Sequence, residues 1–320
     1  MKMSTFLLAR FRRAITSKQG SVLIALLILV SIVSFMSPFF LTSRNIFNVL
    51  RQFSIIAILS VGQAMIIIIG GIDLSVGFVT GLMGVLTGLI ARLGVPWPGV
   101  FVLVVLLGVA VGFINAVMIT RIGINPFIAT LGMFSIARGT SLLLTGGMPV
   151  AIRNPITFMG GGYVGPVPMS AITMFVVATL GHIIMTRTVF GRNIYAIGNN
   201  PRAAELSGIR VDRTRTIVHM IMGALTAIAG MTLSGTLATA EPAAGGGYEL
   251  DVIAAVVIGG ASLSGGEGSI IGVILGAALM GVLRNSFVLL GISAYWQVVS
   301  IGVVIIIAVA IDSIKTKRRG

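Results

Sequence analysis

Long apolar stretches, separated by short polar breaks, run along almost the whole chain. A helix that crosses the hydrocarbon core of a membrane needs ~20 mostly apolar residues, and charge-free stretches reach or approach that length repeatedly between residues 19 and 311. With proline, glycine and charge as boundaries, the pattern predicts ten helices, near residues 21–38, 47–69, 75–91, 98–119, 125–145, 169–186, 216–238, 251–264, 268–289 and 294–312.

The predicted helix at 251–264 is shorter than most of the others and runs into a glycine-rich stretch. It is either a full span or a broken or re-entrant element, so eight spans also fit the pattern. The pattern therefore predicts an all-α polytopic membrane protein, with residues 1–320 forming a single transmembrane domain.

The composition agrees with this prediction. The chain has 56% hydrophobic residues, 9% charged residues and a mean hydropathy of +1.09, which is more apolar surface than one soluble core of this length needs. The absence of cysteine excludes disulfides, cysteine zinc sites and thiol catalysis. The formal net charge of +14 does not predict a nucleic-acid partner, because the long charge-free stretches cannot supply the exposed basic stripe that such binding needs.

The positions of Lys and Arg predict the orientation, because short cytoplasmic loops hold an excess of these residues. In the ten-span arrangement, 16 of the 22 basic residues fall on one side: five in the N-terminal segment, Arg121, six in the loop at 187–215 and four in the C-terminal tail. Both termini and the loop at 187–215 are therefore predicted to be cytoplasmic. Six spans precede this loop and an even number must follow it, which excludes nine.

A short motif occurs twice, as GG-x-x-LS-x-G at 70–77 and at 259–266. Transporters are often built from internal repeats with broken helices at corresponding points. In a chain with 42 glycines the match is either such a repeat or chance. The candidate pathway or broken-helix residues from the motif are Gly70, Gly71, Asp73, Ser75, Gly259, Gly260 and Ser264.

Two charged residues lie within the apolar pattern. An ion at the centre of a membrane helix costs about 2.5–3.5 kcal/mol and should face protein or water. Asp73, the only acid in the first 204 positions, either lies on a transport path or caps the helix after it, and we favour the cap because Gly70 and Gly71 resemble a helix end. Arg138 either faces a polar path or holds a helix contact, and we favour the contact.

Sites for chemistry are not indicated by the sequence. His182 and His219 are single histidines without ligands at metal-binding spacing, and Glu249 and Asp251 are expected to cap the helix at 251–264. No lysine follows a glycine, so a phosphate-binding P-loop is absent. We predict no catalytic residue, metal or cofactor, and ATP, if it drives the protein, must bind to another chain.

The loop at 187–215 contains the strongest local helix signals outside the spans. The pair Asn200 and Pro201, with Asn199 before it, predicts a helix start, and Gly208 is placed as the glycine that ends it. Glu205 and Asp212 are expected to form local ion pairs. The segment is either an ordinary solvated loop or a docking surface for a soluble partner, formed by Asn199, Asn200, Pro201, Arg202, Ala203, Ala204, Glu205, Leu206, Ser207 and Gly208.

Four extended motifs occur in order along the chain: GGIDLSVG at 70–77, FIATLGM at 127–133, GRNIYAIGNNPRAAELSGI at 191–209 and EPAAGGGYELDVIAAVVIGGASLSGGEGSIIG at 241–272. On these motifs the chain resembles the membrane permeases of ribose-type sugar ABC importers, a family related to the branched-chain amino-acid permeases. The resemblance covers nearly the whole length.

The resemblance implies a permease subunit in a bacterial inner membrane, which carries a monosaccharide by alternating access. It implies three protein partners: a cytosolic ATPase that docks on a coupling helix at 199–209, a periplasmic sugar-binding protein, and a second permease copy or paralogue. Arg202 stands where many relatives have an acid, so no particular salt bridge with the ATPase is implied. The segments 146–168 and 239–250 are expected to contact the binding protein. The alternative is a self-sufficient secondary transporter or channel for a small polar solute.

Overall fold

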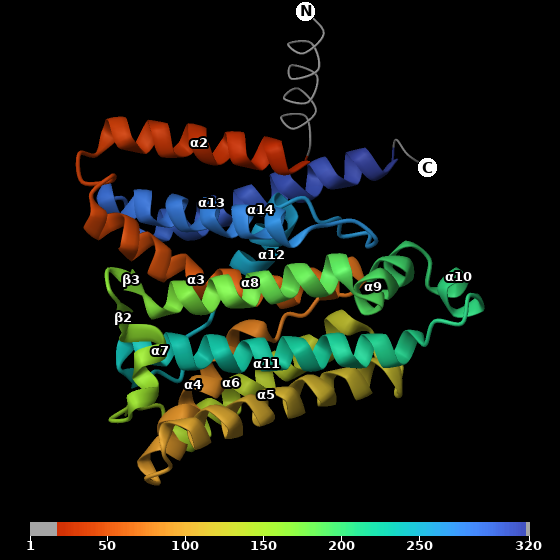
Figure 1. Ribbon diagram of the computed structural model, residues 1–320, viewed down its shortest axis with the longest axis horizontal. Coiled ribbons are helices and arrows are strands. Elements are labelled where there is room, and N and C mark those ends of the chain that lie inside the picture. The colour runs from red at the N-terminus through yellow and green to blue at the C-terminus, as the bar shows by residue number, and fades with distance from the viewer. Residues whose placement is uncertain (1–17, 318–320) are drawn as a thin grey trace, which may run out of the picture.

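Helices make up almost all of the structure. The computed structural model describes residues 18–317 and contains the ten predicted helices (Figure 1), which are α2 (Lys18–Met36), α3 (Ser43–Ile68), α4 (Val76–Arg92), α5 (Trp97–Thr120), α6 (Pro126–Thr145), α8 (Met169–Arg187), α11 (Val211–Leu237), α12 (Tyr248–Ile258), α13 (Ile270–Leu289) and α14 (Ala294–Lys317). The shorter elements are β1 (Val150–Ala151), η1 (Pro155–Thr157), α7 (Phe158–Gly161), β2 (Tyr163–Val164), β3 (Val167–Pro168), α9 (Val189–Asn199), α10 (Pro201–Leu206) and β4 (Thr239–Ala240).

Seven helices in the described part of the chain are long and apolar enough to cross a membrane, namely α2, α3, α5, α6, α8, α11 and α13. Helix α4 and the stretch Tyr295–Ile307 of α14 are shorter apolar helices. Helix α12 has 11 residues, which corresponds to about 16 Å and about half of a hydrocarbon core. The segment predicted at 251–264 is therefore a broken, half-length helix that ends at Ile258.

The two ends of the bundle differ. Helices α9 and α10 project from one end, which we call the α10 end, and the strand pairs β1–β4 and β2–β3 lie at the other, the hairpin end (Figure 1). Helix α2 starts and α14 finishes at the α10 end. The cytoplasmic placement of both termini stays a prediction, since residues 1–17 and 318–320 lie outside the described residues.

Helices α3 and α11 form the centre of the bundle. In α3, 89% of the membrane-length window is buried, and in α11 67%, whereas in α2 only 11% is buried. Helix α11 packs against α3, α4 and α5, and α3 packs against α8, α12 and α13. The apolar side chains that remain exposed on the outer helices are those expected to face lipid.

Glycines bring α5 and α11 into direct backbone contact. A Cβ added at Gly108 or Gly112 on α5 would collide with the carbonyl oxygen of Gly223 or His219 on α11, and one added at Gly223 would collide with the carbonyl oxygen of Gly108. Apolar surface gives no driving force between helices in lipid, so close packing of small residues is a main source of their association.

A pair of buried amides joins the start of α3 to α13. The Nδ2 atom of Asn45 donates to Oδ1 of Asn285 at 3.0 Å, and Nδ2 of Asn285 donates back to Oδ1 of Asn45 at 3.0 Å. Asn45 also donates to the carbonyl oxygen of Phe40 at 2.9 Å. This reciprocal pair satisfies polar groups that could not be satisfied by lipid.

The two copies of the repeated motif both end a helix, but one residue out of register. Gly70 follows α3 with φ 90°, and Gly260 follows α12 with φ 92°, so each takes the left-handed conformation that commonly terminates a helix. The motif alignment pairs Gly70 with Gly259 instead. Beyond the glycines the copies differ, because the first leads directly into α4, whereas the second continues as a loop to Ser269. An internal repeat stays a prediction.

The contact between α5 and α11 yields a stability test. Gly223→Val should lower the unfolding temperature of the purified chain by several degrees, because the added side chain collides with the backbone of α5 and overpacking costs about 1–3 kcal/mol or more. Gly302→Val is the matched control, since a Cβ at Gly302 meets open space. Equal unfolding temperatures for the two variants would contradict the close contact.

Candidate functional site

Helix α9 is an amphipathic helix that the sequence analysis missed. Its N-cap is Thr188, whose Oγ1 accepts from the backbone N–H of Gly191 at 3.1 Å, and it buries Gly191, Ile194 and Ile197. The prediction that Asn199 begins a helix is wrong, because Asn199 is the last residue of α9. The glycines in this stretch lie where the helix backbone approaches other backbone.

Helix α10 has the caps that the sequence predicts. Oδ1 of Asn200 accepts from the N–H of Ala203 at 3.0 Å, with Pro201 at the first helical position. Gly208 has φ 84°, and the N–H of Ile209 donates to the carbonyl of Ala204 at 3.1 Å. The helix start at Asn200 and Pro201 and the terminating glycine are therefore confirmed.

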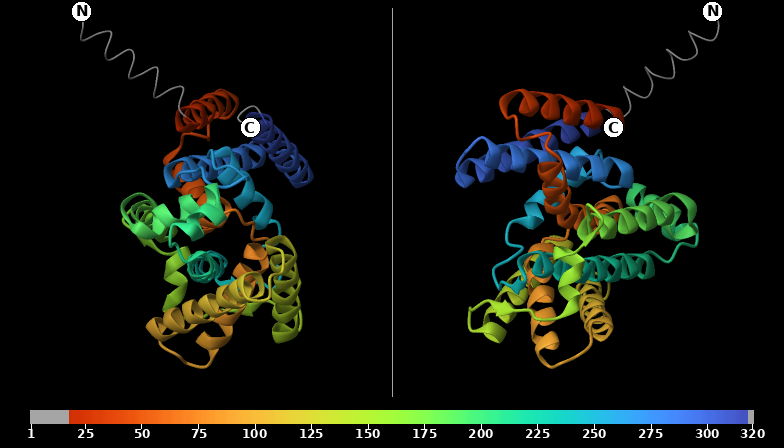
Figure 2. Two further views of the ribbon diagram at one scale, coloured as in Figure 1. Left: turned by 90° about the vertical axis from the view of Figure 1, so that its right-hand side faces the viewer. Right: turned by 60° about the vertical axis from the view of Figure 1, so that its left-hand side comes forward.

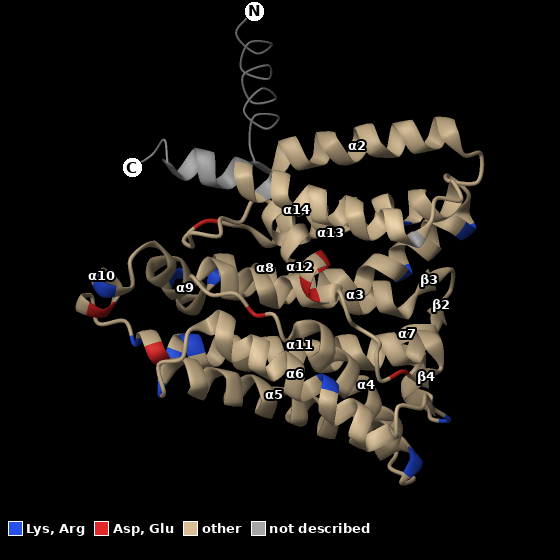
Figure 3. Ribbon diagram, turned by 180° about the vertical axis from the view of Figure 1, so that it is seen from behind, with Lys and Arg blue, Asp and Glu red and all other residues tan. Residues whose placement is uncertain are grey.

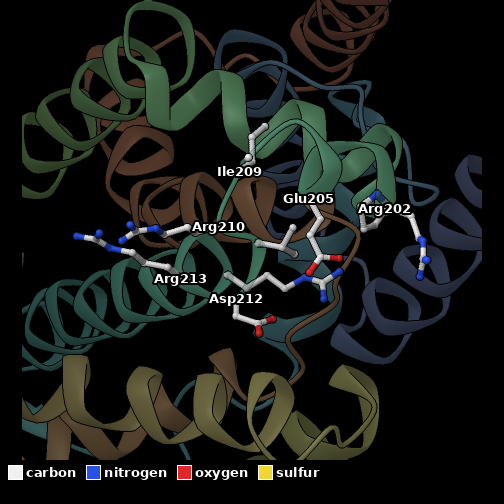
Figure 4. A pocket seen from close by; sticks show the side chains of 10 residues that line it. Arg202, Glu205, Ile209, Arg210, Asp212 and Arg213 are labelled. Atoms are coloured by element: carbon white, nitrogen blue, oxygen red, sulfur yellow. The ribbon is translucent and has the colours of Figure 1, made fainter.

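Helix α10 presents nearly its whole surface to solvent. Only Ala204 is buried, and Leu206 is 82% exposed, so a large apolar side chain stands free on a helix outside the bundle. Helix α10 and the start of α11 enclose an open cleft of about 640 Å³ (Figure 4). The charged residues that line this basic cleft are Arg202, Glu205, Arg210, Asp212, Arg213 and Arg215.

The predicted local ion pairs of Glu205 and Asp212 are wrong, since neither carboxylate pairs with a basic group in the part of the chain that the structure describes. Figure 4 shows Arg210 and Arg213 on one side of the cleft and Arg202 on the other, with Glu205 and Asp212 between them. The cleft is basic, because four arginines outnumber two acids in its lining. Charged side chains that are exposed to water in this way are solvated and need no partner within the protein.

Helix α9 rests on the end of α3 and on the loop after the half-length helix α12 at one point, which we call the junction. The carbonyl oxygen of Ile68, at the end of α3, accepts from the N–H of Gly266 in the loop after α12 at 2.9 Å. A Cβ at Gly198 on α9 would collide with that same carbonyl oxygen. The hydroxyl of Tyr195 on α9 donates to the carbonyl of Gly268 at 2.9 Å, and burial raises the pKa of Tyr195, which keeps this donor protonated.

The other glycines singled out by the repeated motif lie close to the junction in sequence. Gly70 and Gly71 follow α3 directly, with the N–H of Gly71 donating to the carbonyl of Ile66 at 2.8 Å. Gly259 lies against the backbone of α13, since an added Cβ would lie 2.6 Å from the carbonyl oxygen of Gly272. Ser264 is exposed in the following loop. These residues terminate helices, and a pathway role for them stays a prediction.

Asp73 is not the cap of α4, because the N-cap is Ser75. Residues 71–74 are irregular, and the carboxylate of Asp73 accepts from the N–H of Ser75 at 2.8 Å and from its hydroxyl at 2.6 Å. Asn115 of α5 in turn donates to the hydroxyl of Ser75 at 3.1 Å. Asp73 is 3% exposed, and it pairs with neither Arg51 nor Arg138 in the described residues.

Arg138 is exposed on α6, well inside a helix long enough to cross a membrane. Its guanidinium carbon lies 5.4 Å from the ring centroid of Phe78, and Phe78 packs edge-on against Phe134 at 4.6 Å between centroids. This cation–π contact partly supports the helix-contact hypothesis. The exposure nevertheless leaves most of the charged group unsatisfied by this chain.

The sequence analysis missed a buried ion pair. Arg284 of α13 donates to Asp251 of α12, so Asp251 does not cap its helix as expected. Asp251 is fully buried and the side chain of Arg284 is 33% exposed. The partners are 33 residues apart, and the only signal in the sequence was that each is a charge inside an apolar stretch.

Among the described residues, His, Asp and Glu do not gather in a group of three or more that could hold a metal ion. The polar groups in the bundle instead bond to one another in small sets, each joining two helices. Such sets hold helices in position relative to one another.

Seven membrane-length helices, a half-length helix whose following loop meets the end of α3 at the junction, and an exposed helix beyond it are the features of a multi-pass membrane transport protein. The chain belongs to the family described as "Branched-chain amino acid transport system / permease component", which matches residues 45–309. It is thus a transport subunit and not an enzyme, and the description as one component of a system implies partner chains.

Curated relatives cover nearly the whole chain. The ribose import permease protein RbsC of Escherichia coli (strain K12) is 41% identical over 95% of this chain and 96% of its own length, and that of Haemophilus influenzae is 40% identical over 91% of each. The galactose/methyl galactoside import permease protein MglC of H. influenzae is 37% identical over 94% of this chain and 96% of its own length. No solved structure matches significantly. These bacterial import permeases and the seven apolar helices place the chain in the bacterial inner membrane.

The hydrogen bonds of Asp73 yield a second prediction. Asp73→Asn keeps the oxygen that accepts from Ser75, so it should retain stability and transport, whereas Asp73→Ala removes both bonds and should lose about 1–3 kcal/mol of stability. Thermal unfolding and sugar uptake by the two variants measure this difference. Loss of uptake in a normally folded Asp73→Asn protein would show that the charge itself is needed, as on a transport path.

Proposed function

We propose that this chain is the membrane permease of an ABC importer, which forms the path for a monosaccharide and is driven by a separate cytosolic ATPase. The single observation that supports this most is the position of α10, an exposed helix joined through α9 to the junction between the end of α3 and the loop after the half-length helix α12. The names of the relatives, import permeases for ribose and for galactose or methyl galactoside, support a sugar as the substrate.

The α10 end is the cytoplasmic end in this proposal, because it holds the basic loop at 187–215. Residues 199–208 form the surface that docks on the ATPase, with Leu206 inserting into a groove of the partner and the basic cleft facing acidic groups at its rim. The hairpin end is then periplasmic. There the segments 146–168 and 239–250 would receive the sugar-binding protein.

The packing at the junction supports a path for the force. Gly198 touches the carbonyl of Ile68 and the N–H of Gly266 without an intervening side chain, so a displacement of α9 must shift the end of α3 and the loop after α12 together. Closely packed segments of this kind transmit displacement because they cannot be compressed. ATP-driven movement of α10 would thus change how the broken helices meet, as alternating access requires.

A second copy of the permease, identical or paralogous, completes the path in this proposal. Helices α6 and α14 lie on the opposite side of the bundle from α8 (Figure 2), and Figure 3 shows that side, with a basic segment on α6 and acidic segments on α12. Exposed Arg138 would cost about 2.5–3.5 kcal/mol at the centre of a lipid-facing helix. Gly132 and Gly139 beside it face open space, so this face of α6 is suited to a partner or a shared aqueous path.

Reconstitution tests the proposal directly. Proteoliposomes with this chain, its ATPase and its sugar-binding protein should accumulate labelled ribose or galactose only when ATP is hydrolysed, because no nucleotide site is evident in this chain. The control is the chain alone under a proton or sodium gradient. Accumulation in that control would contradict the proposal and favour a self-sufficient secondary transporter.

The exposed leucine of α10 yields a separate prediction. Leu206→Asp should weaken ATPase binding tenfold or more, because burying a leucine at an interface is worth about 1.5–3 kcal/mol and 1.4 kcal/mol corresponds to about a factor of ten. The matched control is Leu93→Asp, since Leu93 is 80% exposed and follows α4 at the opposite end of the bundle. Binding of the ATPase to each variant measures the effect, and equal weakening by both would contradict docking through α10.

A further inference from the structure

A cavity of about 280 Å³ lies between four helices towards the hairpin end of the bundle. This chamber is near the lower limit for small-molecule sites in proteins. Its lining comes from the first half of α3, the last turns of α11, the start of α12 and the last turns of α13, through Arg51, Gln52, Phe53, Ile55, Ile56, Leu233, Thr236, Leu237, Tyr248, Gly281 and Arg284.

The polar lining has unused hydrogen-bonding capacity. The Nε atoms of Arg51 and Arg284 are buried without a partner in the described structure, although Arg51 donates through Nη2 to Asn48 at 3.3 Å. Arg284 is held by its ion pair with buried Asp251, whose Oδ1 also lacks a partner. Buried polar atoms without partners are uncommon and costly, so a group that bonds to them is expected.

The lining of the chamber has an apolar, aromatic part and a polar part. Phe53, Leu233 and Tyr248 supply apolar and aromatic surface, whereas Arg51 and Thr236 supply polar atoms. A sugar ring has the matching division, with apolar C–H faces and hydroxyl edges. A planar guanidinium with several N–H groups can donate to two neighbouring hydroxyl oxygens at once.

The hydrogen-bonding groups of the chamber, rather than its charge, favour a neutral ligand. Asp251 compensates Arg284, which leaves the guanidinium of Arg51 as the uncompensated charge of the lining. Gln52 and Thr236 each offer both a donor and an acceptor, and hydroxyl groups can use both. An anion would use the donors alone.

Arg51 also connects the chamber to the surface. It lines a second, more open cavity of about 530 Å³, together with Thr42, Arg44, Asn48 and Tyr163 among others. Arg51 lies eight residues after Ser43, the first residue of α3, which is about 12 Å along the helix. A solute that enters from the hairpin end would therefore meet Arg51 between the outer cavity and the chamber.

We infer that the chamber is a sugar-binding site of the permease itself, which takes a neutral monosaccharide from the hairpin end past Arg51. The inference rests on the proposed function, since it names a place where the transported sugar binds. It adds a selective step within this chain, with Arg51 as the residue that binds hydroxyl groups and Asp251 as the residue that positions Arg284.

Cysteine protection tests the site, because the natural chain has no cysteine. Thr236→Cys places one thiol in the lining of the full chain in lipid nanodiscs, and a small neutral methanethiosulfonate reagent labels it. D-ribose or D-galactose at ten times its dissociation constant should slow the labelling about tenfold, because about a tenth of the chambers remain empty. Ser293→Cys, on the exposed loop after α13, is the control, and its labelling rate should not change.

Further variants identify the groups involved. Arg51→Gln in the Thr236→Cys background should abolish protection, whereas Arg44→Gln, which changes only the outer cavity, should retain it. Protection that survives Arg51→Gln would overturn the role of Arg51. Stronger protection by D-ribose 5-phosphate than by D-ribose would overturn a neutral ligand in favour of an anion.

Uptake by the complete transporter separates this inference from the proposed function. A Leu237→Cys permease has its thiol in the same lining, at a residue with no role in binding hydroxyl groups. Assembled with its ATPase and binding protein, it should import sugar in an ATP-dependent way, and its thiol should be protected by that sugar. Import without protection, at sugar concentrations up to the solubility limit, would overturn the chamber as a binding site and leave the permease function standing.

Discussion

The carbonyl oxygen of Ile68 accepts a hydrogen bond from the backbone N–H of Gly266 at 2.9 Å, and the rest of the structure depends on contacts of this kind. A helix that breaks inside a membrane frees backbone groups that lipid cannot satisfy. Here α3 and the loop after α12 satisfy each other, and Gly198 lets α9 approach both. The breaks are therefore tolerated only because they are brought together.

The buried charges are satisfied in three different ways. Asp73 is held by the backbone and hydroxyl of Ser75, Asp251 is paired with Arg284, and Arg138 is left exposed over the ring of Phe78. The first two are held by partners within the chain, so they fix helix positions, although Oδ1 of Asp251 has no partner in the described structure. The third is incomplete, and an incomplete charge inside a membrane helix requires water or another protein. The same desolvation cost thus gives structural roles to two residues and an interface role to one.

Helix α3 links the two halves of the proposed mechanism. Near its start it contributes Arg51 to the chamber, and at its end it contributes Ile68 to the junction. Ile68 lies 17 residues after Arg51, which corresponds to about 26 Å of continuous, buried helix. A movement of α10 that shifts the junction would therefore also shift the chamber, because the rigid helix α3 connects the two. Such coupling would tie the affinity of the permease for sugar to the state of its ATPase.

The sequence by itself determined the helices, the class of protein and the caps of α10, because these depend on local properties. A membrane-length apolar stretch is recognised wherever it lies, and Asn200, Pro201 and Gly208 act on backbone atoms a few residues away. The extended motifs likewise identified the family before any contact was known. The same local signals also led to an error, since Asn199 was expected to begin a helix but is the last residue of α9.

Only the tertiary structure decided which groups meet. Glycine in a sequence does not distinguish a helix end, as at Gly70, from a close backbone approach, as at Gly198. Asp251 was expected to act on its own helix, but its partner is 33 residues away. In a membrane the apolar pattern states that a residue is buried but not whether lipid or protein buries it, because both are equally apolar. The choice between the two, and with it the junction and the chamber, arises only when the helices pack.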